Sequence, residues 1–253
     1  MPRYALLVEY DGAPFVGWQR QTNGLSVQQV LEEAGAPLNG GETPETVASG
    51  RTDAGVHAEG QVVQIELKLD LPPERLREAL NVRSRPHPVS VVSVARAPED
   101  WSARFSACGR AYRYRILNRR ARPALEAGRV WHVPQKLDAA AMHEAAQMLL
   151  GRHDFSAYRA ATCQAKHAMR TLDQLDVSRL GDEVHIHTAA RSFLHHQVRN
   201  MVGTLVEVGL GRKAVTWPRQ ILDGADRTRA GQTAPADGLT FLRAEYPEPL
   251  DWC

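Results

Sequence analysis

The spacing of apolar residues changes repeatedly along the chain between the patterns that identify strands and helices. A strand is predicted over 4–10, where apolar residues alternate with others. A helix follows from Ser26, which begins a capping-box pattern, to Ala34. The later predicted elements are strands over 46–49 and 61–67, a helix from Pro73 to Asn81, and a strand over 89–95. The resulting order, β-α-β-β-α-β, is that of a ferredoxin-like unit.

The rest of the chain repeats this order without repeating its sequence. A strand is predicted over 111–117, a helix capped by Asp138 runs to Gly151, and a hairpin turns at Gly181. The remaining elements are the hairpin strands 171–177 and 183–188, helices over 196–208 and 218–222, and a strand over 239–245. We therefore predict an α+β fold with two ferredoxin-like domains, residues 1–104 and 105–253. Their strands are expected to form one extended, mixed but mainly antiparallel sheet with the helices on one face.

The composition points to a cytoplasmic protein. No apolar run approaches the ~20 residues of a membrane helix. The N-terminus passes straight into a predicted strand, without the apolar stretch of a signal peptide. The three cysteines form no CxxC pair, and their number is odd. A disulfide framework or a zinc site is therefore disfavoured, and we expect a reducing cytoplasm and no membrane partner.

Basic residues are unevenly distributed, although the net charge is only +2. Seven arginines and no acidic residue lie between Arg104 and Arg122, with Tyr112 and Tyr114 among them. Arginine offers forked donors that suit phosphate groups. The segment is either an RNA-binding surface or a solvated face, and charge alone does not separate the two.

The loop from Gly50 to His57 concentrates reactive groups between two predicted strands. Arg51, Thr52, Asp53 and His57 supply a cation, a hydroxyl, a carboxylate and an imidazole. An aspartate beside glycines is also ordinary turn chemistry. Taken alone, the loop therefore favours a turn, and a catalytic carboxylate needs matching features elsewhere.

Matching features extend along nearly the whole chain. Residues 50–57 (GRTDAGVH) resemble the signature of the TruA family of tRNA pseudouridine synthases. The other stretches that resemble this family are 9–12 (EYDG) with Phe15, 17–21 (GWQRQ), 102–107 (SARFSA), Arg110 with 112–114 (YRY), 193–203 (FLHHQVRNMVG), and 234–236 (APA) with 238–239 (GL). Because several separate motifs agree in the same order, the resemblance is specific.

The resemblance implies an isomerase, an intramolecular transferase that converts uridine to pseudouridine at positions 38, 39 and 40 of the tRNA anticodon stem-loop. It also implies a homodimer with tRNA as partner, and Asp53 as the catalytic carboxylate. The reaction breaks the bond from C1′ to N1, turns the uracil and joins C1′ to C5, so no atoms or electrons are lost. No cofactor is therefore expected, in agreement with a sequence that shows no dinucleotide or P-loop fingerprint.

Three roles are open to Asp53: attack on C1′, stabilisation of a cationic sugar, and removal of a ribose proton. Each needs a carboxylate that stays ionised while shielded from water, which a nearby cation favours. Arg199 lies among apolar residues near the start of a predicted helix. Taken alone it is equally a snorkelling side chain with a solvated head. With the resemblance, we predict an Arg199–Asp53 pair.

The resemblance also assigns residues that bind the substrate. Tyr112 corresponds to the site tyrosine and is expected to stack on the target uracil, with a core position as the alternative. The target nucleotide must be flipped out of its helix, and Arg51 is expected to fill the vacated space or grip the adjoining phosphate. The further predicted RNA contacts, for which surface or core positions are the alternative, are Trp101, Arg104, Phe105, Arg120 and Lys166.

Other chemistries are weaker interpretations of the sequence. His185 and His187 would share a strand face, but no third metal ligand is evident, so we expect no metal site. A catalytically silent RNA-binding module would gain nothing from a carboxylate at position 53. A methyltransferase would need a glycine-rich cofactor loop and a metal-dependent hydrolase a ligand cluster, and the sequence shows neither.

Overall fold

The computed structural model describes all 253 residues as ten strands and five α-helices. The strands are β1 (Arg3–Tyr10), β2 (Thr46–Ala48), β3 (His57–Glu66), β4 (Val89–Arg96), β5 (Gly109–Leu117), β6 (Trp131–His132), β7 (Gly151–Asp154), β8 (Met169–Leu180), β9 (Glu183–Ala190) and β10 (Leu239–Glu245). The helices are α1 (Val27–Gly35), α2 (Pro73–Arg83), α3 (Ala139–Gln147), α4 (Gln197–Gly209) and α5 (Trp217–Gly224). None of the helices is both long and apolar enough to span a membrane.

The Cα positions divide the chain into two compact units, Met1–Arg110 with Phe241–Cys253, and Ala111–Thr240. In the first unit β1 pairs antiparallel with β4 on one side and β3 on the other, and β2 pairs with β3. In the second unit the order is β5-β9-β8-β7, with β6 parallel to β5. The α+β class, the mainly antiparallel sheet and the β-α-β-β-α-β order are confirmed, with two short strands, β6 and β7, added to that order in the second half. The domain boundary between residues 104 and 105 stays a prediction.

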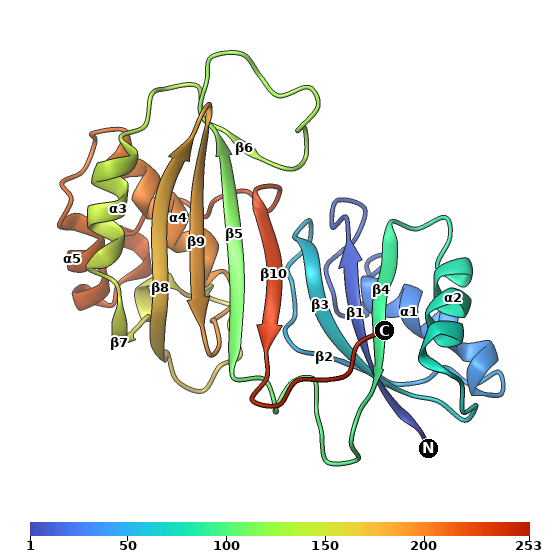
Figure 1. Cartoon of the computed structure of the whole chain (residues 1–253). Helices are drawn as coiled ribbons and strands as arrows, with labels where there is room; N and C mark the ends of the chain where they lie inside the picture. The colour runs from blue at the N-terminus through green and yellow to red at the C-terminus, as the bar shows by residue number, and fades with distance from the viewer. The chain divides into compact units, whose positions relative to one another are not determined.

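The sheet of the first unit is covered differently on its two faces (Figure 1). Tyr4, Leu6 and Val8 are fully buried, and the Tyr4 hydroxyl donates to the carbonyl of Leu71 just before α2, at 2.9 Å. The alternate residues of β1 point the other way. There, Ala5 belongs to a small cluster with Trp101, against which the C-terminal segment packs. Cys253 ends that segment by exchanging two backbone hydrogen bonds with Val94 of β4.

Helix α3 packs against β8 and α4 in the second unit (Figure 1). The Asp138 carboxylate accepts the N–H groups of Ala140 and Ala141, both at 3.0 Å, so the predicted cap is confirmed. The predicted end at Gly151 is wrong, because α3 stops at Gln147. The next amides bond to carbonyls three residues back, which tightens the chain into a turn before Gly151 opens β7 with φ +96°.

Strand β3 begins at His57, before the predicted start at residue 61. The early part contains Gly60, which ordinarily weakens a strand. A Cβ at Gly60 would lie only 2.5 Å from the carbonyl oxygen of Leu242 in β10. Glycine is therefore required by the close approach of a neighbouring backbone, a contact that the local pattern does not reveal. Strands β6 and β7 were not predicted, because two and four residues are too few to show alternation.

Candidate active site

The loop that carries Asp53 is a tight turn entering β3. The N–H of Val56 donates to the carbonyl of Asp53 at 3.1 Å. Gly55, the third residue of this turn, has φ +79°, as a type II turn requires. Asp53 is half-buried and Arg51 is exposed. The two interpretations of the sequence, an ordinary turn and a catalytic carboxylate, are thus compatible, because the turn presents the carboxylate.

Two glycines of the preceding segment allow its backbone to lie directly against this turn. A Cβ at Gly12 would lie 2.1 Å from the carbonyl oxygen of Val56. A Cβ at Gly17, which has φ +108°, would lie 2.8 Å from the carbonyl oxygen of Thr52. The Trp18 N–H donates to that same Thr52 oxygen at 3.1 Å. The turn is therefore held by backbone contact on both sides of Asp53.

Buried hydrogen bonds fix the base of the loop. The hydroxyl groups of Tyr10 and Thr52 lie 2.8 Å apart, and both residues are buried. Burial raises the pKa of Tyr10 to about 12, against the opposing effect of hydrogen bonds with Thr52 and Gln61. The Gln61 amide donates to the carbonyl of Gly50 at 2.7 Å. These contacts hold the backbone immediately before Asp53.

His57 closes the loop as a structural residue. Its Nδ1 accepts the N–H of Gly12 at 3.0 Å and lies 3.2 Å from Oδ1 of Asp11. The ring is buried. The imidazole therefore ties the end of the loop to the 11–12 segment, which also supplies the close glycine contact.

The segment from Trp101 to Ala107 separates into a buried and an exposed part. The Trp101 ring packs against Tyr246 in the small cluster and is only 8% exposed. Phe105 is 79% exposed, and the Arg104 guanidinium lies 5.4 Å from its ring centroid. Of the predicted RNA contacts in this segment, Arg104 and Phe105 therefore offer free surface, whereas Trp101 occupies the core position that was its alternative.

In the second unit the two tyrosines of β5 have different surroundings. Tyr112 is half-buried, and its ring meets Phe193 edge-on at 5.3 Å. Tyr114 is fully buried and donates its hydroxyl to the carbonyl of Pro235 at 2.8 Å. Burial raises the pKa of Tyr114 well above its usual value, while the charge of Arg199 opposes that rise. Tyr114 is thus a core residue, whereas Tyr112 is only partly covered.

Arg199 is the third residue of α4 and is tied to the C-terminal motif. Its Nε donates to the carbonyl of Ala234 at 2.7 Å, and the Ala234 N–H donates back to the Arg199 carbonyl at 3.1 Å. A Cβ at Gly203 would lie 1.8 Å from the Gln232 carbonyl oxygen. Glycine one turn along α4 therefore permits the close contact that brings the 232–234 segment to Arg199.

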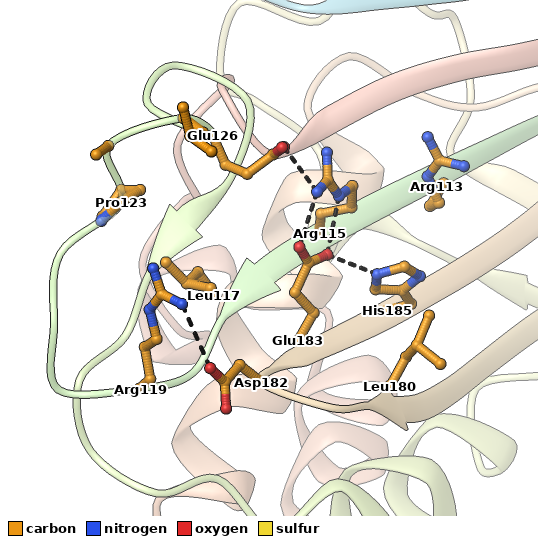
Figure 2. A pocket seen from close by; sticks show the side chains of 12 residues that line it. Arg113, Arg115, Leu117, Arg119, Pro123, Glu126, Leu180, Asp182, Glu183 and His185 are labelled. Carbon is orange, nitrogen blue, oxygen red and sulfur yellow. Dashed lines mark hydrogen bonds and ion pairs between the residues drawn. The ribbon is translucent and has the colours of Figure 1, made fainter.

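Arg120 and Lys166 are both exposed to solvent. Near Arg120, an open pocket at the end of β5 and the start of β9 is rich in charge (Figure 2). Arg115 lies between Glu126 and Glu183, with both ion pairs at 2.8 Å, and Arg119 pairs with Asp182. His185 Nε2 lies 2.7 Å from Oε2 of Glu183, so this histidine is hydrogen-bonded to a carboxylate that also binds Arg115. The pocket therefore lacks the reactive constellation of the Asp53 loop.

The structure brings together two pairs of the predicted site residues. Arg51 and Asp53 share one loop, Arg104 and Phe105 one exposed turn, and Tyr112 and Arg199 lie in the second unit. The pairing of Arg199 with Asp53 stays a prediction. The residues that position the loop were given no such role from the sequence, although all but Gln61 lie in its motifs. They are Tyr10, Gly12, Gly17, Thr52, Gln61 and Arg110.

Comparisons with known proteins identify the family of the chain. A family model described as tRNA pseudouridine synthase matches residues 6–106 and 145–247. Relatives named tRNA pseudouridine synthase A include one from Acidiphilium cryptum, 60% identical over 247 residues that cover 97% of both chains. Another, from Methylobacterium sp. (strain 4-46), is 59% identical over 98% of this chain and 99% of its own. A third, from Rhodospirillum rubrum, is 55% identical over 98% of this chain and 88% of its own.

The fold, the motifs and these matches define the class: the chain belongs to the tRNA pseudouridine synthases, isomerases that act on tRNA. Within that class it is a member of the TruA family, because the relatives named tRNA pseudouridine synthase A match it over nearly its full length. The resemblance found from the sequence motifs is confirmed.

Proposed function

We propose that this tRNA pseudouridine synthase acts on uridines 38, 39 and 40 of the anticodon stem-loop, with Asp53 as the essential carboxylate. The observation that carries the proposal is the way Asp53 is held. Its backbone is enclosed by Gly12 and Gly17 and anchored through buried Thr52, yet its side chain remains half-buried. A carboxylate fixed this firmly, but still reachable, suits a reaction that depends on placement at one carbon of the ribose.

The chemistry requires only rearrangement within one nucleotide. The bond from C1′ to N1 breaks, the uracil turns, and C5 bonds to C1′. The proton on C5 then leaves, which restores the C5–C6 double bond, and N1 takes up a proton, so the product is an isomer of the substrate. Asp53 either attacks C1′, stabilises positive charge on the sugar, or removes a ribose proton. All three roles place the carboxylate beside the ribose, so all three require the nucleotide to leave its stack.

The other site residues receive roles from their exposure and chemistry. Arg51 is exposed two residues before Asp53, where it can fill the space left by the flipped nucleotide or bind its phosphate. Tyr112, with its half-buried ring, stacks on the target uracil. The pairing of Arg199 with Asp53, predicted from the sequence, is part of this proposal. The Arg199 Nε is engaged by Ala234, which fixes the direction of the side chain.

RNA backbone binding is assigned to exposed groups. Arg104 lies over the ring of exposed Phe105, a combination that can grip phosphate and stack on a base. Arg120 and Lys166 provide further exposed charge. Trp101 is left out of this surface because its ring is packed in the core cluster.

The test is to incubate the protein with unmodified tRNA and map pseudouridine by carbodiimide-dependent primer-extension stops. We expect stops at positions 38–40, which disappear when those uridines are replaced. Asp53→Asn and Asp53→Ala should give no product while keeping tRNA affinity. Product from either variant would contradict the role of Asp53. Binding without product from the unaltered protein would favour the silent RNA-binding module.

We also propose a cytoplasmic homodimer. A bacterial enzyme family that modifies tRNA works where tRNA is made and used, which supports the cytoplasm. Two leucines at the pocket of Figure 2 support self-association, since Leu125 is 96% and Leu180 69% exposed. The pocket holds three arginines and three carboxylates, and such a mixed surface suits a second copy better than a polyanion.

A further inference from the structure

We propose that Arg110 is a positioning residue that sets the distance between the RNA-binding turn at Arg104–Phe105 and the loop of Asp53. The inference rests on the proposed function of those two segments. It concerns the geometry of catalysis within bound RNA, and it assigns Arg110 no contact with the substrate.

The Arg110 guanidinium binds backbone carbonyl groups from two separate segments. Its Nε and Nη2 donate to the Ser49 oxygen at 3.1 and 2.8 Å. Its Nη2 also donates to the Arg104 oxygen at 2.7 Å, and Nη1 donates to the Ala107 oxygen at 3.1 Å. Arg110 thus joins Ser49, just after β2, to both ends of the 104–107 turn. These four hydrogen bonds are called the Arg110 clamp.

The Ser49 end of this clamp is rigid and leads directly into the catalytic loop. Ser49 is buried, and its N–H donates to the Val62 carbonyl at 2.8 Å. Its hydroxyl donates to the side chain of Gln61, which in turn holds the Gly50 carbonyl. A displacement of the Ser49 backbone is therefore expected to move Gly50, Arg51 and Asp53 with it.

The other end of the clamp is also a closed unit. The Ser106 hydroxyl accepts the N–H of Ser102 at 3.0 Å, and the Ser102 hydroxyl accepts the N–H of Phe105 at 3.3 Å. The Tyr246 hydroxyl donates to the Ala103 carbonyl at 2.7 Å. Because these hydrogen bonds hold the turn together, any shift of the Arg110 clamp is expected to displace the whole turn, including Arg104 and Phe105.

The chemistry of arginine is needed for this task. A planar guanidinium presents several donors in fixed directions and can reach three carbonyl groups at once, whereas a lysine ammonium acts from a single point. The rigid guanidinium of Arg110 therefore fixes the distance between RNA bound at the turn and the carboxylate of Asp53. Loss of the clamp should slow the reaction of bound RNA while leaving its affinity nearly unchanged.

The experiment compares Arg110→Lys and Arg110→Met with Arg3→Met as the matched control. Arg3 is also half-buried and binds Glu66 and the Trp101 carbonyl, but it has no bond to the Asp53 loop. The measurements are tRNA affinity by filter binding, the single-turnover rate of pseudouridine formation, and thermal unfolding. Both Arg110 variants should lose about 100-fold in rate with affinity within about 3-fold, as expected for a misplacement of ~1 Å. Arg3→Met should lose stability alone.

Two further measurements separate the outcomes. Phe105→Ala should slow the unaltered enzyme and should have a smaller effect in the Arg110→Met background, because the turn is no longer registered. Hydrogen exchange should rise in both 49–57 and 102–107 in the Arg110 variants and in neither segment in Arg3→Met. The exchange result tests the clamp even if the unaltered protein makes no pseudouridine, an outcome that would contradict only the proposed function. A wild-type rate in Arg110→Met, equal losses of rate and affinity, or unchanged exchange at 49–57 would overturn the clamp.

Discussion

At the scale of single residues, the turn that carries Asp53 keeps its position because Gly12, which lies against it, has no side chain. Gly12 leaves room for the Val56 carbonyl, and a methyl group there would lie 2.1 Å from that oxygen. Backbone atoms cannot move aside as a flexible side chain can. Any larger residue at position 12 must therefore displace the turn that carries Asp53.

We expect Gly12→Ala to reduce the rate of pseudouridine formation by about 100-fold, since displacement by ~1 Å at a reacting group has that effect. Affinity for tRNA should change little. The measurements are single-turnover rates and filter binding, with Gly41→Ala as control. Gly41 also lies in a loop of the first unit, with φ +88°, but has open space around it. That control should lose about 1 kcal/mol of stability and keep its activity; equal activity in both variants would contradict the prediction.

The sequence identified Asp53 and its loop but not the residues that hold it. A reactive aspartate within GRTDAGVH is visible because its neighbours in the chain carry the motif. The roles of Gly12, Tyr10 and Arg110 depend on contacts between segments that are distant in the chain. Periodicity and turn chemistry describe local order, so they contain no information about which backbone lies against which.

At the scale of elements, α5 ends in a conformation that its sequence does not favour. Ala225 has φ +50° and ψ +21°, and its N–H donates to the Leu222 carbonyl. The left-handed region at a helix end is usually occupied by glycine, because a Cβ is strained there. The chain places its glycine one residue earlier, at Gly224.

We expect Ala225→Gly to stabilise the protein by about 1 kcal/mol, by removing the strain of a left-handed alanine. Ala225 is exposed, so no packing is lost. Urea unfolding monitored by circular dichroism provides the measurement. Ala140→Gly, an exposed position with helical backbone in α3, should instead destabilise by up to about 1 kcal/mol. A destabilised Ala225→Gly variant would show that the alanine is not strained.

The ion pair between β5 and β9 makes a stability contribution that depends on pH. Arg115 donates two hydrogen bonds to the Glu183 carboxylate, at 2.9 and 2.8 Å, which hold the pKa of Glu183 at about 2 instead of 4.5. Because the folded pKa is the lower one, the contribution is complete above pH 4.5 and is lost as the pH falls toward 2.

We therefore expect Glu183→Gln to be less stable than the unaltered protein by about 1 to 2 kcal/mol at pH 7, allowing for solvent screening. The difference should shrink steadily between pH 4.5 and pH 2. Urea unfolding of both proteins across this range isolates the effect, since other carboxylates titrate in both. A difference that stays constant with pH would mean that the pair adds packing rather than charge stabilisation.

Element boundaries could be predicted where a local signal exists. The caps at Ser26 and Asp138 accept the expected amide hydrogens, and the Gly181 turn has φ +58°. Two boundaries could not be predicted. The end of α3 depends on how the chain must turn into β7. The start of β3 depends on the approach of β10 to Gly60.

At the scale of the whole molecule, the repeated β-α-β-β-α-β order was predictable although no sequence repeats. The two halves share the spacing of apolar residues that their common fold requires. Their individual residues differ because each half contributes different side chains to the protein. The return of Phe241–Cys253 to the first unit was not predictable. It depends on contacts such as Val94 with Cys253, which only the folded chain brings together.

The surface around the pocket of Figure 2 is the one that the proposed dimer would use. Leu125 is almost fully exposed, which is costly for an isolated chain in water. The neighbouring Arg115 and Arg119 are already paired with carboxylates, so little charge is left to attract RNA. A patch with leucines and both signs of charge is self-complementary when two copies meet about a two-fold axis.

We expect the unaltered protein to sediment at about twice its 28.0 kDa chain mass, and Leu125→Glu to sediment as the single chain. The substitution removes from each copy a leucine that the proposed dimer would bury, and brings a new carboxylate beside Glu126, Asp182 and Glu183. Loss of apolar burial and like-charge repulsion together should weaken association by at least about 100-fold. Analytical ultracentrifugation over a range of concentrations measures the effect. Val82→Glu, at an exposed apolar position on α2, is the control and should leave the mass unchanged. A Leu125→Glu variant that still sediments at twice the chain mass would place the interface elsewhere, and an unaltered protein that sediments as a single chain would exclude the dimer.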